Sequence, residues 1–452
     1  MAQGSREPNT ALAQAIQEAG LSRNGLAARV RQVSARHGAP VKAGHQSVSR
    51  WLAGTPPHAA TARYIAEVLS ERLGRALTPC DLGLPTSLDD AMTFSPGEYH
   101  TDLQGAVEAM AALVVADSAQ SPKVSECVDQ ALWNSAAMAW LFNETDAEAR
   151  VSKHARRIGA AEIAQVETTA AAFMALDFQL GGGGSQLMLC RYFQHDVLPL
   201  LHDVRDDANG RALLSAAASV TQLLGWTAYD LGWHQRAQQY MTQGLRMAQQ
   251  AQDHMLGARF LANMSHQANY LGRFNQARQL ARAAQERAQV ASPSVRAMLL
   301  AMEARACAGA GDSRGAGRAL DHAERALENA HLGDEPAWIS YFDASELAGE
   351  AAHCFRDLKQ PRSAQPFILR ALELTPATCT RTKAFIQLVN AASCLHTRNV
   401  DQACDFTLSA LNDGVGLKSA RYARYVRDVV SDFAPYKGSV SVDIALREAA
   451  GL

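Results

Sequence analysis

The sequence predicts an all-α protein with a small helical domain at its N-terminus and a long solenoid of stacked helix pairs behind it. Three observations support this prediction. Apolar residues recur at three- and four-residue spacing through most of the 452-residue chain. A seven-residue unit occurs in five copies in the second half of the chain. The first 80 residues carry ten basic and four acidic residues, although the whole chain has a net charge of −2.

Residues 1–84 are expected to form four or five short helices. The first helix is expected to end at Gly20, and Ser22 is expected to cap the second. A later helix is expected to begin at Pro57 and to end before Gly74. The inner faces of these helices are expected to hold Leu12, Ile16, Ala19, Leu26, Val30, Val33, Ile65, Val68, Leu69 and Leu73. This succession of short helices is typical of a helix-turn-helix domain.

The stretch Val41 to Gly54 is the candidate DNA-reading helix. Val48, Trp51 and Leu52 form one apolar face, and Gly54 ends the helix. Amide, hydroxyl and basic groups occupy the other face, where they suit base edges in a major groove. The predicted DNA-binding residues are Lys42, His45, Gln46, Ser47, Ser49 and Arg50. The alternative is a small amphipathic helix whose polar face is only solvated.

The charge distribution favours the DNA-binding interpretation. Residues 1–80 have a net charge of +6, which leaves −8 for the rest of the chain. A basic domain attached to an acidic body is the pattern expected for contact with phosphate backbones. We therefore expect double-stranded DNA as a partner.

Three runs in this domain, LAARVRQVSARHG, SVSRWLAGTPPH and IAEVLSERLGRALTPCDLGL, carry a resemblance over roughly residues 20–84. The chain resembles actinobacterial regulators that join a helix-turn-helix head to a helical-repeat body, of the type described as negative regulators of differentiation and antibiotic production. The resemblance implies a repressor that controls secondary metabolism or development. One departure is the connection SARHGAPVKAG, which is longer than the 3–4 residues usual between the two helices of the motif.

A linker is expected at residues 85–101, and a helical segment at 102–210 begins the repeat body. Within that segment, Arg150 to Arg157 form a basic cluster, either a second phosphate contact or a solvated helix face. Residues 181–185, GGGGS, lack the preceding strand and following G-K-[ST] of a phosphate loop. We expect them to be a flexible connection between helices.

Residues 211–452 contain the repeat. The units are LGWHQRA, LGRFNQA, AGDSRGA, LKQPRSA and TRNVDQA, ending at Ala237, Ala277, Ala316, Ala364 and Ala403. A small residue follows seven positions after each alanine, where paired antiparallel helices would approach closely. This pattern is the tetratricopeptide signature, and its period near 40 rather than ~34 predicts helices longer by about a turn.

The first helices of the pairs would line a concave surface, which is where solenoids usually bind. Its amide, aromatic, histidine and arginine side chains suit a peptide or a small ligand, although ordinary packing inside the superhelix is the alternative. The predicted groove residues are Gln222, Trp226, Tyr229, Asp230, Arg259, His266, Asn269, Tyr270, Arg305, His353 and Arg356.

Other classes of protein are not favoured. The eight cysteines include no C-x-x-C pair, so we expect buried thiols without disulfides and no metal site. The common hydrolase, zinc-protease and phosphate-loop motifs are absent, so we expect neither an enzyme nor a cofactor. No apolar run approaches ~20 residues, and the first ten residues lack an apolar core, so we expect a cytoplasmic protein without membrane contact.

These observations predict a DNA-binding transcription regulator. The repeat body would form a homodimer and sense a peptide, a small ligand or a protein partner, because two-fold operators commonly need two reading helices. Regulation by a short peptide is implied by resemblance to other regulators of this architecture. One alternative is a scaffold whose repeats bind another protein. Another is DNA binding without any effector.

Overall fold

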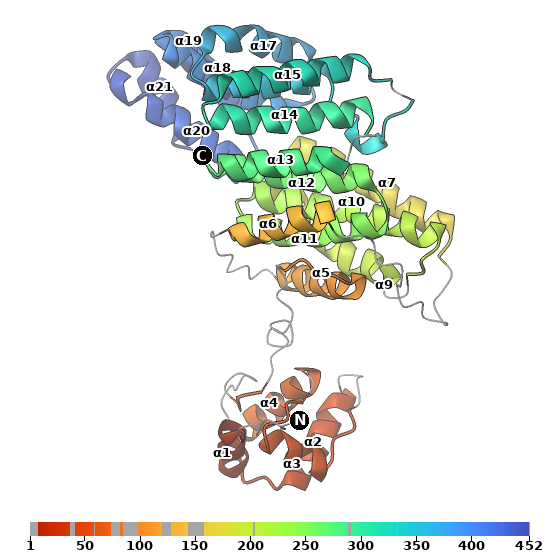
Figure 1. Ribbon diagram of the computed structural model, residues 1–452. Coiled ribbons are helices and arrows are strands. Elements are labelled where there is room, and N and C mark those ends of the chain that lie inside the picture. The colour runs from red at the N-terminus through yellow and green to blue at the C-terminus, as the bar shows by residue number, and fades with distance from the viewer. Residues whose placement is uncertain are drawn as a thin grey trace. The chain divides into compact units, whose positions relative to one another are not determined.

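The computed structural model describes residues 8–36, 41–57, 59–73, 82–84, 98–119, 128–142, 158–201, 204–287, 291–331 and 333–451. The chain forms two compact units, Met1–Pro96 and Gly97–Leu452. Every regular element in these described ranges is a helix (Figure 1). The predicted all-α fold, with a helix-turn-helix domain and a solenoid of tetratricopeptide-like repeats, is confirmed.

The first unit is a bundle of α1 (Thr10–Glu18), α2 (Arg23–Arg36), α3 (His45–Leu52) and α4 (Ala59–Leu73). Its core is built from the predicted apolar faces, with Leu12, Leu26, Val30, Val48 and Leu69 fully buried. Gly20 and Gly54 have φ of +62° and +89°, as expected of glycines that end helices.

Asn9 ties the two ends of this unit together. Its side-chain oxygen caps α1 by accepting from the Leu12 N–H at 2.9 Å, and its side-chain nitrogen donates to the carbonyls of Leu82 and Gly83. Leu82 and Leu84 then complete the hydrophobic core.

The second unit begins with the helices that precede the repeats. They are α5 (Leu103–Ser118), α6 (Gln130–Phe142), α7 (Ala160–Leu180), α8 (Gly182–Tyr192), the π-turn η2 (Phe193–Val197) and α9 (Leu198–Leu201).

Five helix pairs follow, and the last is extended by a sixth. The pairs are α10 (Ala208–Asp230) with α11 (His234–Gln250), α12 (His254–Tyr270) with α13 (Phe274–Arg287), α14 (Pro293–Gly309) with α15 (Ser313–Glu328), α16 (Ala344–Asp357) with α17 (Pro361–Leu374), and α18 (Thr380–His396) with α19 (Val400–Asp413). The extension is α20 (Ala420–Asp432) with α21 (Val440–Ala449). Short 3₁₀ turns, η3 (Ala337–Ile339) and η4 (Ala434–Tyr436), precede α16 and α21.

The five units of the sequence repeat occupy one structural position. The second residue of each unit has a positive φ, namely Gly232, Gly272, Gly311, Lys359 and Arg398. The next residue donates its N–H to the carbonyl five positions back in the first helix, as Trp233 does to Ala228 at 2.9 Å. The terminal alanines are buried where the helices of each pair meet, and at Gly244 a Cβ would overlap the Phe260 ring. The turn and the small residues together set the spacing of each pair.

Helices α5 and α6 cover the outer helices of the first two pairs. Polar side chains of α11 bond to the backbone of this cover. Gln249 Nε2 donates to the Ala139 carbonyl of α6 at 3.1 Å, and Arg246 Nε donates to the Thr101 carbonyl, just before α5, at 3.1 Å. Trp140 Nε1 donates to the Ala283 carbonyl in α13 at 2.9 Å. This cover buries an α11 whose sequence is polar.

Residues 181–185 are not the flexible connection that we predicted. Gly182, Gly183 and Gly184 form the first turn of α8, where the Gly182 N–H donates to Asp230 Oδ2 and the Gly183 N–H to the Lys418 carbonyl, both at 3.0 Å. A Cβ at Gly182 would lie 2.6 Å from the Thr227 carbonyl oxygen. The glycines allow close backbone approach rather than motion.

Several predictions fall outside the described residues. These are most of the 85–101 linker, the basic cluster Arg150–Arg157, Cys80, Cys127 and the middle of the long connection before α3. Of the other six cysteines, five are buried thiols and Cys379 is half-buried. Within the described ranges, no helix combines the length and the hydropathy that crossing a bilayer requires.

Candidate functional site

Helix α3 presents a polar face with a firm apolar anchor beneath it. Val48 and Trp51 are buried against the core of the first unit. Lys42, which precedes α3, is exposed, and so are His45, Gln46 and Arg50 on the helix. Four of the six predicted DNA-binding side chains, on α3 or just before it, are therefore exposed to solvent.

The two serines among the predicted DNA-binding residues already have partners inside the unit. Ser47 Oγ accepts from the Gly44 N–H at 3.3 Å and helps to cap α3. Ser49 Oγ donates to the His45 carbonyl at 2.9 Å and accepts from Arg23 Nη1 at 3.1 Å. Arg23 is exposed on the first turn of α2, so it adds a cation beside α3 that the sequence analysis did not select.

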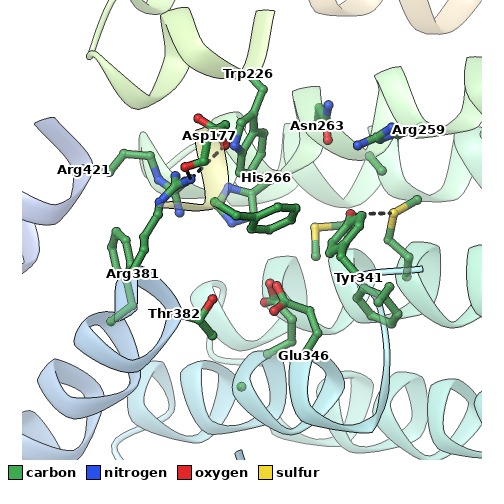
Figure 2. A pocket seen from close by; sticks show the side chains of 18 of the residues that line it. Asp177, Trp226, Arg259, Asn263, His266, Tyr341, Glu346, Arg381, Thr382 and Arg421 are labelled. Atoms are coloured by element: carbon green, nitrogen blue, oxygen red, sulfur yellow. Dashed lines mark hydrogen bonds and ion pairs between the residues drawn. The ribbon is translucent and has the colours of Figure 1, made fainter. Parts of the chain in front are cut away.

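The second unit contains a partly open cavity of about 140 Å³, here called the central cavity, on the inner side of the repeats. The first helices of five consecutive pairs (α10, α12, α14, α16 and α18) contribute to its wall, together with α7, α20 and the segment before α16 (Figure 2). Six of the eleven predicted groove residues line it: Gln222, Trp226, Arg259, His266, Arg305 and His353.

The other predicted groove residues lie elsewhere. Asn269, Tyr270 and Arg356 line a second, more open pocket of about 500 Å³ that His266 and Arg305 also border. Tyr229 and Asp230 reach neither space, because both are fully buried behind the wall. The Tyr229 hydroxyl lies 2.9 Å from His266 Nδ1, and Asp230 is paired with arginines.

Three of the four arginines that line the central cavity lie within 4 Å of a carboxylate of the chain. Arg305 pairs with Glu350 at 2.6 Å, and Arg381 pairs with Asp177 at 2.9 Å and Asp230 at 2.8 Å. The Arg421 guanidinium lies 3.6 Å from Asp230 and stacks on Trp226 at 5.1 Å.

Burial and these ion pairs set the charge of Asp230. Burial opposes its ionisation, but Arg381, Arg421, the Gly182 N–H and Ser419 outweigh burial, so the pKa of Asp230 is lowered. Burial raises the pKa of Asp177 in spite of Arg381. Burial and the ion pairs therefore shift the pKa values of these two carboxyl groups in opposite directions.

Arg259 is the exception among the four arginines. Its guanidinium is buried, Nη2 contacts Met174 Sδ at 3.9 Å, and the Trp338 ring centroid lies 4.6 Å away. No carboxylate pairs with it in the described part of the chain, and Nε has no hydrogen-bond partner there. Burial lowers the pKa of Arg259, but arginine keeps its charge at neutral pH.

The acid–base groups of the central cavity are mostly neutral. Burial raises the pKa of Glu346 to about 8, and the Glu350 and Asp343 carboxylates add to the shift. Burial lowers the pKa of His266 and of His353 well below 6.5, and nearby arginines add to both shifts. At pH 7 Glu346 is therefore protonated and both imidazoles are uncharged.

Two amide side chains also present unpartnered polar atoms. Gln222 Oε1 and Asn263 Nδ2 are buried in the wall without a hydrogen-bond partner among the described residues. Buried polar groups normally have partners, so these two atoms are available to bond a molecule that enters the cavity. Within the described ranges, no three His, Cys, Asp or Glu side chains form a metal-binding group.

Several residues that line the central cavity were not predicted from the sequence. Asn263 lies four positions after Arg259 on the same helix face, a spacing that could have identified it. Arg381 and Arg421 were not selectable by the repeat pattern, because the fifth and sixth pairs meet the first only through the curvature of the superhelix. Glu346 lies seven positions before His353 on the same helix, a spacing that could have identified it.

Comparison with known proteins finds a similarity for one part of the chain. Residues 12–85 match the family of the SP15 N-terminal domain, so this similarity covers the first unit. Neither the curated proteins nor the solved structures contain a match to the chain.

Proposed function

We propose that this protein is a DNA-binding transcription regulator whose repeat body senses a ligand. The observation that carries the proposal is the outward face of α3, where Lys42, His45, Gln46 and Arg50 are all exposed over a buried apolar anchor. Amide and guanidinium groups can bond base edges, and lysine and histidine at the helix entrance can contact phosphates. The net charge of +6 in residues 1–80 supports the same partner.

The repeat body supplies the regulatory half of the proposal. Its central cavity gathers charged, amide and aromatic side chains from five helix pairs, so a bound molecule would contact residues of more than one pair. Occupancy would then change the curvature of the body. In a homodimer this change would alter how two reading helices are presented to a two-fold operator.

The resemblance to actinobacterial regulators suggests the kind of regulation. A negative regulator of differentiation and antibiotic production would bind operators as a repressor, and its effector would release or strengthen that binding. Double-stranded DNA, a second copy of the chain and a ligand in the repeat body are the partners that this proposal requires.

The test is binding of the full chain to its own upstream region and to a scrambled fragment, measured by fluorescence anisotropy across a salt series. We expect preference for the upstream fragment and an affinity that falls as salt rises, by ~0.9 log units per log unit for each phosphate contact. Gln46→Ala with Arg50→Ala should remove the preference, because both base-facing side chains are lost.

A matched control pair lies on α2. Arg29 and Gln32 are exposed outside α3, so Arg29→Ala with Gln32→Ala removes the same two residue types and should leave the preference intact. Equal binding to both fragments that neither pair changes would contradict operator reading. The scaffold alternative would then be the better account of the repeats.

A further inference from the structure

Arg259 and Asn263 present unpartnered N–H groups on one face of α12. They are four residues apart, so their side chains lie one turn from each other (Figure 2). Both are more than nine-tenths buried, at 5% and 7% exposure, and Arg259 Nε and Asn263 Nδ2 lack partners among the described residues. A guanidinium and an amide N–H together form a donor set for a carboxylate.

The neighbouring arginines show why Arg259 stands apart. Arg305 and Arg381 line the same cavity, but each pairs with a carboxylate of the chain within 3 Å. A buried charge without a partner is costly, so a partner for Arg259 is expected from outside the chain. Because one cation is uncompensated, the complementary ligand carries one negative charge.

The surroundings of Arg259 are apolar. Met174 contacts the guanidinium, and Tyr341 lies 5.6 Å from Phe178 between ring centroids and 3.5 Å from Met298 Sδ through its hydroxyl. All four residues line the central cavity. Glu346 is protonated near neutral pH and does not repel an anion there.

We propose that the central cavity binds a small organic monocarboxylate. Its carboxylate accepts from Arg259 and Asn263, and its apolar body packs among Met174, Phe178, Met298 and Tyr341. The inference rests on the proposed sensing role of the repeat body and names the chemical class of the effector.

The volume limits the size of this ligand. A protein cavity of roughly 150 Å³ holds benzene, so the central cavity of about 140 Å³ suits a body of about one aromatic ring. An extended peptide would not fit wholly within this volume. Benzoate and phenylacetate are therefore suitable probes, with benzamide as the neutral molecule of matched shape.

The experiment is calorimetric titration of the full chain with benzoate, phenylacetate, benzamide and inorganic phosphate. We expect saturable binding of at least one carboxylate at one site per chain, and binding of benzamide at least tenfold weaker. Arg259→Gln should weaken the carboxylate at least tenfold, and Asn263→Asp should weaken it by placing a negative charge beside the ligand. Arg325→Gln on the surface of α15 is the control, because it removes an exposed arginine and should change nothing.

Three results would overturn the inference: no saturable binding of either carboxylate, equal binding by the Arg259→Gln variant, or phosphate binding as tight as the carboxylates. Thermal unfolding of each variant verifies that the fold is retained. Operator binding is measured separately without ligand. Loss of carboxylate binding with intact operator binding rejects only this inference, whereas absent operator binding rejects the proposed function.

Discussion

Asp230 Oδ1 accepts a hydrogen bond from Arg381 Nη2 at 2.8 Å across 151 positions of sequence. Asp230 ends the first helix of the first pair, and Arg381 begins the first helix of the fifth. The same carboxylate accepts from Ser419 Oγ at 2.9 Å and from the Gly182 N–H at 3.0 Å. One buried aspartate thus joins α8, α10, α18 and the start of α20, and closes the superhelix around the central cavity.

Asp230→Asn should destabilise the repeat body strongly. The substitution removes the charge that compensates Arg381 and Arg421, and breaking a buried pair typically costs about 3–5 kcal/mol. Urea unfolding followed by circular dichroism measures the change. Asp321→Asn breaks an exposed i,i+4 pair with Arg325 and should cost less than ~0.5 kcal/mol. Equal effects of the two substitutions would contradict a closing role for Asp230.

Gly182→Ala should also destabilise the closure. A Cβ there would lie 2.6 Å from the Thr227 carbonyl oxygen, so α8 must shift away from α10, at a cost of about 1–3 kcal/mol. Gly317→Ala is the matched control in the exposed interior of α15, where a Cβ meets nothing within 4 Å. It should raise stability by roughly 0.5–1 kcal/mol because alanine favours helix. Similar melting temperatures for the two variants would show that the glycine turn tolerates side chains.

The features that the sequence predicted are local ones. Each repeat unit has its turn residue and its two small residues within a span of 14 positions, so their spacing is visible without any tertiary information. Helix α3 was predicted for the same reason, since Val48 and Trp51 share a face set by helical geometry.

The features that it missed depend on contacts between distant helices. The glycine run was expected to be flexible because composition alone cannot reveal Thr227 and Lys418 against it. Tyr229 and Asp230 were assigned to the groove by position in the repeat, but closure by Arg381 and Arg421 buries both. Arg259 was predicted as a groove residue. That no carboxylate pairs with it among the described residues depends on how the helices assemble around the cavity, so the sequence could not reveal it.

Stability should depend on pH through Glu346. The pKa of this carboxyl is raised from 4.5 to about 8 in the folded state, so the unfolded chain loses the proton first. Between about pH 4.5 and 8 the folded state binds one more proton, and this group therefore makes stability fall as pH rises. Glu346→Gln should remove that slope. We expect the variant to match the wild type near pH 5 and to exceed it by about 1–3 kcal/mol at pH 8.5.

Parallel urea titrations of both proteins at pH 5, 7 and 8.5 measure this difference. Glu324→Gln is the control, because Glu324 lies on the exposed face of α15 in a pair with Arg370. A difference between Glu346→Gln and the wild type that stays constant with pH would contradict a raised pKa.

Arg259→Met should stabilise the ligand-free protein while removing its proposed anion site. The guanidinium is buried without a carboxylate, and methionine fills similar space without a charge to desolvate. Stacking on Trp338 is lost, which offsets part of the gain. We expect a net increase of about 1–2 kcal/mol in the free energy of unfolding, measured in urea without added carboxylate.

Arg305→Met gives the contrasting case, because it leaves the Glu350 carboxylate without its partner and should lower stability. If the free energy of unfolding rises in Arg259→Met and falls in Arg305→Met, Arg259 is a group that serves binding at the expense of stability. A lower free energy of unfolding in both variants would contradict that role.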